Sequence, residues 1–209
     1  MNIIKTRNAI SLVASMVALM LLVACAKTQQ LPVLSKNDVV LAFGDSITFG
    51  TGAAPEESYP VVLEQIIGRR VINAGIPGEV TAEGLARLPD VLDREKPLIV
   101  IICLGGNDFL RRMNKKETAG NIREMVRICR QKGAAVVLLA VPAPGLSMSP
   151  EPIYREIAKD LTVVLEEKTL SSILADGTLK SDIIHPNAAG YRRLAEAVSE
   201  LLKKTGAIE

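Results

Sequence analysis

The sequence predicts an α/β fold, a three-layer αβα sandwich around a five-stranded parallel sheet in the flavodoxin-like order 2-1-3-4-5. Short apolar runs of strand length alternate with longer segments whose apolar residues recur at helical spacing. The connections between them are short, which favours parallel strands covered by helices on both faces. The 209 residues are enough for one domain with a sizeable core.

The expected strands are apolar runs bounded by polar or turn-forming residues. Val39 to Phe43, for example, is β-branched at its start and lies between Asp38 and Gly44. The five runs are residues 39–43, 70–73, 98–104, 135–141 and 172–175.

The expected helices have apolar residues three and four positions apart. Tyr59, Val62 and Leu63 begin such a stripe, and Pro89 is expected to kink or split the second helix. The helical segments are residues 59–67, 81–94, a stretch marked by Ile122 to Cys129, 154–167 and a last helix capped by Asn187.

The N-terminus has the pattern of an export signal. Residues 1–24 carry Lys5 and Arg7 and then an uncharged run that is shorter than the ~20 residues of a comfortable membrane span. The run ends in Leu-Val-Ala-Cys25, which resembles a bacterial lipobox and implies cleavage before Cys25 and lipidation of its sulfur. A transmembrane anchor and an ordinary signal peptide are the alternatives.

This pattern divides the chain into a signal peptide at residues 1–24, an unstructured lipid-anchored tether at 25–36 and a single domain at 37–209. It predicts an exported protein held on a bacterial membrane through Cys25, facing the periplasm or the cell surface. We expect a monomer.

Composition excludes several classes of function. Loss of Lys5 and Arg7 with the signal lowers the formal net charge from +2 to about zero, and the chain has no Trp and only 3% aromatic residues, so a nucleic-acid partner is not expected. A single histidine and no clustered ligands predict neither metal nor cofactor. Cys103 and Cys129 could pair after export, but buried single cysteines favour free thiols.

Candidate catalytic residues follow the strands at their carboxyl ends, which meet at one edge of a parallel sheet. Ser46 follows the first strand and is a candidate nucleophile, although a serine here could simply cap a helix. The sequence contains one histidine, His185, so a histidine that takes the proton of Ser46 can only be this residue. Asp182, three residues earlier, can reach the imidazole and orient it.

Four sequence blocks in the same order resemble those of the GDSL, or SGNH, hydrolase family over roughly residues 37 to 203. They are Gly44-Asp-Ser-Ile47, Asn73-Ala-Gly-Ile-Pro-Gly78, Gly105-Gly-Asn-Asp108 and Asp182-Ile-Ile-His-Pro186. The stretch Gly84–Pro89 is also similar to the branch of small thioesterases, arylesterases and lysophospholipases.

The resemblance implies donors for an oxyanion. The candidates are the backbone N–H groups of Ser46 and Gly78 and the side-chain amide of Asn107, with Gly75 as the turn former of its block. Asn107 could instead only hold its own loop.

Two further aspartates, Asp45 and Asp108, are expected to be structural, accepting bonds from loop N–H groups. Thr48 replaces the last glycine of the nucleophile elbow found in α/β-hydrolases, so a shallower site is expected.

Two groups near the third block have alternative interpretations. A basic cluster could receive an anionic head group or be a solvated loop, and an apolar set could line an acyl pocket or pack in the core. The basic residues are Arg111, Arg112, Lys115 and Lys116, and the apolar residues are Leu110, Met113, Leu146 and Met148.

The resemblance therefore implies a serine esterase that hydrolyses carboxylic ester or thioester bonds of small acyl substrates through an acyl-Ser46 intermediate. The alternatives are a carbohydrate O-deacetylase of envelope glycans, a flavodoxin-like binding module and a surface lipoprotein without activity. Asp45 would repel the phosphate that a flavodoxin-like module binds after its first strand.

Overall fold

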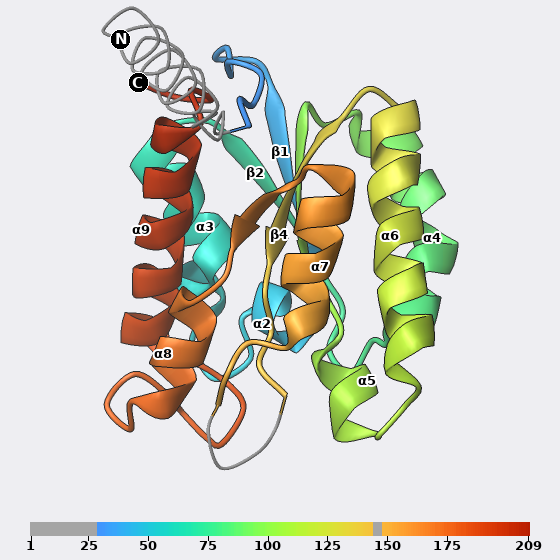
Figure 1. Ribbon diagram of the computed structural model, residues 1–209. Helices are drawn as coiled ribbons and strands as arrows, with labels where there is room; N and C mark the ends of the chain where they lie inside the picture. Colours follow the sequence, from blue (N-terminus) through green and yellow to red (C-terminus); the bar gives the residue numbers. More distant parts are fainter. Residues whose placement is uncertain (1–28, 144–147) are drawn as a thin grey trace, which may run out of the picture.

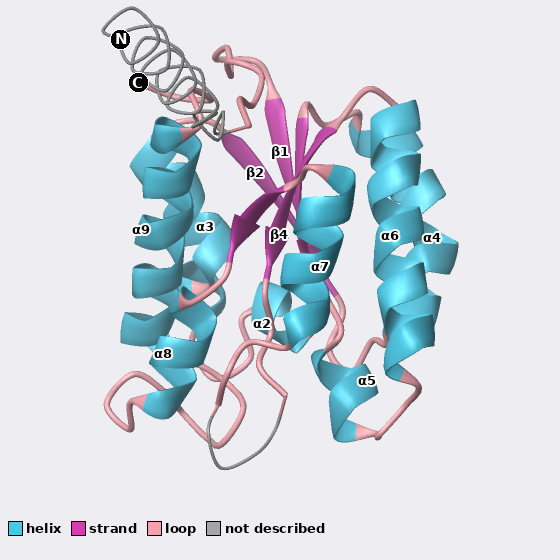
Figure 2. Cartoon of the chain, in the orientation of Figure 1, coloured by secondary structure: helices cyan, strands magenta, loops and turns pink. Residues whose placement is uncertain are grey.

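The computed structural model describes residues 29–143 and 148–209, which form one parallel sheet between two layers of helices (Figures 1 and 2). The strands are β1 Val39–Gly44, β2 Arg70–Gly75, β3 Ile99–Cys103, β4 Ala135–Leu139 and β5 Val164–Glu166. They pair in the order β2-β1-β3-β4-β5, and every pair is parallel. The predicted fold class and strand order are confirmed.

Helices cover both faces of the sheet. They are α2 Ser46–Phe49, α3 Tyr59–Ile67, α4 Thr81–Glu95, α5 Gly106–Leu110, α6 Lys115–Gln131, α7 Pro152–Leu161, α8 Thr169–Ala175 and α9 Ala188–Lys204, with a 3-10 turn at Pro55–Glu57. In Figure 1, α6 lies between α4 and α7, and α3 and α8 lie against α9. The two groups enclose the sheet.

Burial of apolar side chains explains why β3 forms a strand and why α4 remains one helix. All five residues of β3 are buried, as an apolar strand covered on both faces requires. Helix α4 runs through Pro89 without splitting, contrary to one of the two outcomes expected. Leu88, Val91 and Leu92 bury their side chains on the sheet side of this helix, and this burial offsets the hydrogen bond that proline removes.

The prediction of the fifth strand was wrong. Residues 154–167 do not form one helix: Thr162 takes a left-handed φ of 50°, ends α7, and lets Val164–Glu166 pair with β4. Residues 172–175, predicted as the strand, belong to α8. A short apolar run fits helix and strand equally well, and here pairing with the sheet decides between them.

The segment before β1 is packed against the domain. It has no regular secondary structure, but Leu31 and Leu34 are buried, and their N–H groups donate to the carbonyls of Thr205 (2.9 Å) and Ala207 (2.8 Å). Residues 29–36 are therefore not the unstructured tether that was expected. Residues 1–28, including Cys25, lie outside the described part of the chain.

Two further points concern the rest of the fold. Cys103 and Cys129 are both buried and free, as favoured from the sequence. None of the helices in the described ranges is long and apolar enough to cross a bilayer.

Candidate active site

Ser46 is the first residue of α2 and follows the carboxyl end of β1. The side chain of Asp45 caps this helix, accepting the N–H of Ile47 at 3.0 Å, so Ser46 is not the helix cap. The Ser46 hydroxyl is instead 3.0 Å from Nε2 of His185. The chain thus brings the predicted nucleophile and base within hydrogen-bond distance.

Asp182 completes a chain of hydrogen bonds. Its Oδ2 lies 2.8 Å from Nδ1 of His185, and its Oδ1 accepts the N–H groups of Ile184 (2.8 Å) and His185 (2.9 Å). A carboxylate only accepts, so Nδ1 carries the hydrogen and Nε2 presents its lone pair to Ser46.

The Asp182 carboxyl is about half exposed. Partial burial acts to raise its pKa, but the hydrogen bonds from the His185 ring and from the two N–H groups outweigh this and hold the pKa below its usual value.

The loop that carries His185 is fixed at both ends. The N–H of Ser181 donates to the His185 carbonyl at 3.0 Å, and Lys180 forms an isolated β-bridge with Pro186. Asn187 then caps α9 by accepting the N–H of Gly190 at 3.0 Å. The imidazole is therefore held at the start of a rigid helix, as the sequence predicts.

The structure separates the two candidate glycines of the second block. The N–H of Gly75 donates to the side chain of Asn73 (3.0 Å), and a Cβ at Gly75 would lie 2.1 Å from the backbone nitrogen of Phe49. Gly78 lines the same cavity as Ser46, has a left-handed φ of 82°, and its N–H has no partner among the described residues. Of the two glycines, Gly78 therefore lies at the cavity, and Gly75 is a packing position.

Asn107 also faces this cavity, at the start of α5. Its Nδ2 donates to the carbonyl of Glu79 at 3.0 Å and lies 3.3 Å from Oδ2 of Asp45. The preceding Gly105 has φ 118°, and a Cβ there would lie 2.5 Å from the Tyr154 hydroxyl. The paired glycines thus allow the turn that aims Asn107 at the site.

Asp45 and Asp108 have the structural contacts expected of them. Both carboxylates are buried. Asp108 accepts the N–H (2.9 Å) and hydroxyl (2.5 Å) of Thr81.

Burial raises the pKa of Asp45 to about 7, which the nearby carboxylates of Glu79 and Asp108 reinforce and the N–H of Ile47 opposes. Asp45 is therefore a buried carboxyl whose charge changes near neutral pH.

A cavity of about 260 Å³ opens beside Ser46 and His185. Its wall is mostly apolar; the apolar and proline residues are Ile47, Pro77, Leu110, Val141, Pro142, Met148, Leu174 and Ile184. Of the four predicted pocket residues, Leu110 and Met148 line it, and Met113 does not. Met113 is 38% exposed on the outer surface, and Leu146 lies outside the described residues.

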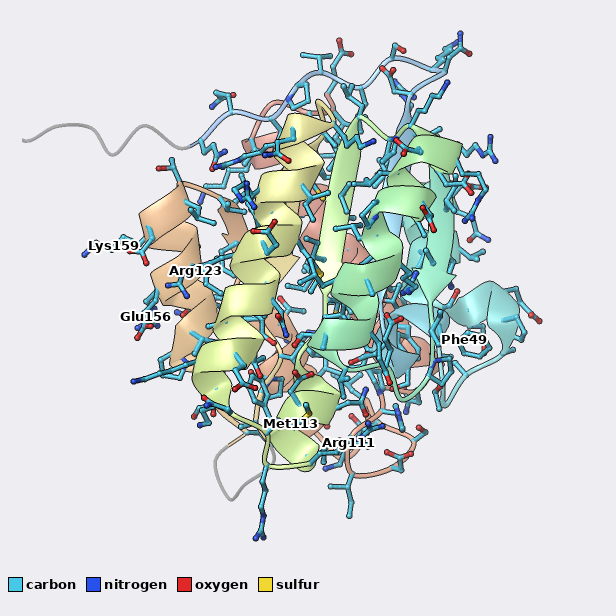
Figure 3. All side chains as sticks on the ribbon, turned by 90° about the vertical axis from the view of Figure 1, so that its right-hand side faces the viewer. Phe49, Arg111, Met113, Arg123, Glu156 and Lys159 are labelled. Carbon is cyan, nitrogen blue, oxygen red and sulfur yellow. The ribbon has the colours of Figure 1, made fainter. Side chains whose placement is uncertain are left out.

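The basic cluster begins directly after Leu110, which lines the cavity. Figure 3 shows Arg111 and Met113 near the bottom of the molecule. Arg111 donates to the carbonyl of Gly78 at 2.8 Å, and Lys115 pairs with Glu151 at 2.7 Å. These two cations therefore have partners within the protein, which favours a structural role for them. No group of three or more His, Cys, Asp or Glu side chains that could hold a metal occurs in the described ranges.

Sequence reasoning missed an ion pair behind the site, between Glu79 and Arg87. Its only signal was the Gly84–Pro89 stretch, whose likeness to one branch of the family gave no role to any residue in it.

Comparison with known proteins identifies the class. Residues 42–193 match the model of the GDSL-like Lipase/Acylhydrolase family, so the chain belongs to that family. The match covers all four sequence blocks.

The relatives specify the chemistry. The chain is 34% identical over 198 residues to esterase TesA of Pseudomonas aeruginosa, covering 88% of this chain and 97% of that protein. It is 28% identical over 174 residues to the thioesterase 1/protease 1/lysophospholipase L1 of Escherichia coli K12, covering 79% and 84%. A crystal structure of TesA superposes with a TM-score of 0.73 at 32% identity, covering 80% and 99%. The protein is a serine esterase.

Proposed function

We propose that the hydrogen-bonded chain Ser46–His185–Asp182 is the catalytic triad of this esterase. Ser46 Oγ attacks the acyl carbon while His185 Nε2 takes the hydroxyl proton. The same imidazole then protonates the leaving alcohol, and water attacks the acyl-Ser46 by the reverse route. Asp182 fixes the tautomer and stabilises the imidazolium. The 3.0 Å Ser46–His185 contact is the observation that carries this proposal.

The oxyanion of each tetrahedral intermediate requires nearby donors. We assign the N–H groups of Ser46 and Gly78 and the amide of Asn107 to this role. The second Nδ2 hydrogen of Asn107 donates to Oδ2 of Asp45 at the longer distance of 3.3 Å, and we propose that it turns from this carboxyl to the substrate oxygen. The first holds Asn107 to the Glu79 carbonyl.

We propose medium-chain acyl esters, and the matching thioesters, as substrates. A methylene group is about as large as the roughly 30 Å³ that a water molecule takes up in the liquid, so the 260 Å³ cavity has room for a chain of roughly eight carbons. An acetyl group would leave most of its apolar wall exposed to water, which argues against the O-deacetylase alternative. The thioesterase and lysophospholipase in the name of one relative are consistent with this substrate class.

Hydrolysis of p-nitrophenyl esters from acetyl to palmitoyl, by residues 26–209, tests both proposals. We expect kcat/KM to rise from acetyl to about octanoyl and then to level off or fall. Ser46→Ala should lower kcat by at least about 10⁴-fold, while Ser35→Ala, an exposed serine at the other end of the domain, should change nothing. An acetyl-only profile would contradict the substrate proposal, and an active Ser46→Ala would contradict the triad.

We propose further that the chain is exported and lipid-anchored through Cys25. The signal pattern of residues 1–24 and the lipobox-like end support this. Mass spectrometry of the protein expressed in bacteria should find a diacylglyceryl-modified N-terminus at Cys25, and Cys25→Ser should release the esterase from the membrane fraction. An unmodified Cys25 in the mature protein would refute the anchor and leave the esterase proposal unaffected.

A further inference from the structure

Arg87 and Glu79 form a two-pronged ion pair directly behind the site. Arg87 Nε lies 2.5 Å from Oε1 of Glu79, and Nη2 lies 2.6 Å from Oε2. The Glu79 side chain is only 4% exposed, so this pair is shielded from water and little screened. A guanidinium matches a carboxylate in this planar geometry, whereas a lysine ammonium would make one contact.

The same guanidinium binds the ends of two strands. Nη2 also donates to the carbonyls of Ala74 at 2.9 Å, on β2, and Gly44 at 3.3 Å, on β1. The guanidinium carbon lies 4.0 Å from the centre of the Phe43 ring, a cation–π contact that fixes its position. Ser46 follows Gly44 by two residues, so the Arg87 side chain sets where the nucleophile loop leaves the sheet.

Glu79 extends this network to the other two donors. Its carbonyl accepts the Asn107 amide at 3.0 Å, and its N–H donates to the carbonyl of Ile76 at 3.2 Å, across the turn that contains Gly78. Thus the segments that carry Ser46, Gly78 and Asn107 all meet at one ion pair.

Gly84 lies close to both Leu104 and the Glu79 carboxylate. A Cβ at Gly84 would lie 2.6 Å from the Leu104 side chain and 3.3 Å from Oε2 of Glu79. The glycine in the first turn of α4 therefore lets this helix pack closely on Leu104, next to the carboxylate that Arg87 binds one turn later. This accounts for two residues of the Gly84–Pro89 stretch.

We propose that the Arg87–Glu79 pair is the positioning element of the oxyanion hole, holding the two N–H donors and the Asn107 amide in register with one another. The proposal rests on the proposed function, because it assumes those three donors. Arg87 acts through the backbone and through Asn107; it does not line the cavity beside Ser46.

The test uses Arg87→Lys, with Arg94→Lys as its matched control on the exposed side of the same helix, where Arg94 is 64% exposed. A donor misplaced by about 1 Å costs roughly 100-fold, so we expect Arg87→Lys to lower kcat about 100-fold and to change KM less than about threefold. Guanidinium added to Arg87→Ala should restore part of the kcat. Arg94→Lys should behave as wild type.

A transition-state analogue separates positioning from mere stability. With an octyl trifluoromethyl ketone, Ser46 Oγ bonds to the carbonyl carbon, the C=O π electrons move onto oxygen, and the hydroxyl proton passes to His185. The inhibition constant measures the oxyanion hole directly. We expect the inhibition constant of Arg87→Lys to rise by about the factor by which its kcat/KM falls.

The outcomes are distinguishable. If Ser46→Ala is inactive but Arg87→Lys keeps the wild-type kcat and inhibition constant, or only unfolds at a lower temperature, the positioning role is refuted and the triad stands. If Ser46→Ala remains active, the proposed function itself fails. A parallel loss of kcat and inhibitor affinity in a variant that is folded by circular dichroism supports the proposal.

Discussion

Two carboxyl groups beside the nucleophile occupy opposite environments. Asp45 is buried, which raises its pKa to about 7, whereas Asp182 is half exposed and its hydrogen bonds hold its pKa below the usual value. Asp182 therefore stays ionised through the neutral range and can stabilise an imidazolium. Asp45 changes charge near neutral pH while it contacts the Asn107 amide.

Asp45 makes stability depend on pH. Its pKa is about 7 in the folded protein, against an ordinary value of 3.8 for the solvated side chain, so the folded state holds the proton more tightly. This contribution is fully present below pH 3.8 and is lost as the pH rises to about 7. Asp45→Asn should flatten the free energy of unfolding across this window. The upper bound is about 4 kcal/mol, since each pH unit is worth about 1.4 kcal/mol.

Urea unfolding at intervals from pH 4 to 8 measures this, with Asp93→Asn on the surface of α4 as the control. The same Asp45→Asn variant should lose kcat, because an amide presents a donor as well as an acceptor to Asn107. A pH dependence identical to that of the wild type would show that Asp45 keeps an ordinary pKa.

At the scale of elements, the sequence predicted the long apolar strands correctly and missed the short strand β5. Strands β1 and β3 are uniformly apolar and end in turn-forming residues, so their positions and the site residues after them follow from the pattern. The three residues of β5 fit the helical stripe that precedes them, and only pairing with β4 makes them a strand.

The candidate site divides in the same way. Ser46, Asp182 and His185 belong to short local motifs and could be found from the sequence. Arg87, by contrast, binds the Glu79 carboxylate and the Gly44 carbonyl. These residues are far from one another in the sequence or share no helical or strand spacing, so no periodic pattern links them. Such side-chain to carbonyl contacts depend on how α4 packs on the sheet, so no local pattern predicts them.

Two glycines in neighbouring helical segments test how the α5 turn serves the site. Gly105 precedes α5 at φ 118° and has no room for a Cβ, while Gly120 lies within α6, where an added methyl group would meet nothing within 4 Å. We expect Gly105→Ala to cost about 1–3 kcal/mol of stability from strain and to lower kcat by displacing Asn107. Gly120→Ala should stabilise the fold by up to about 1 kcal/mol and leave kcat unchanged.

Urea unfolding and p-nitrophenyl ester kinetics on the two variants provide the measurement. If Gly105→Ala loses stability with no change in kcat, the turn supports the fold alone and the position of Asn107 is set elsewhere.

The first described residues and the candidate site lie at opposite ends of the molecule. The first described residues pack on the segment that directly follows α9 at the top of Figure 1, whereas α5 and the loop before α9 lie at the bottom. From Cys25 to Gln29, the chain can extend at most about 14 Å. A lipid on Cys25 would therefore hold the edge opposite the catalytic loops nearest to the anchoring membrane.

This separation predicts that the N-terminal segment can be weakened without harm to catalysis. Leu31 and Leu34 are 5% and 3% exposed, so replacing both by alanine should lower the free energy of unfolding by several kcal/mol, given about 2–5 kcal/mol for a fully buried leucine. Because distant sites act independently, kcat and KM of the folded enzyme should not change. Val33→Ala, between them and 73% exposed, is the matched control and should be neutral in both assays. A loss of kcat at a temperature where the double variant is fully folded would show that the two ends are coupled through the sheet.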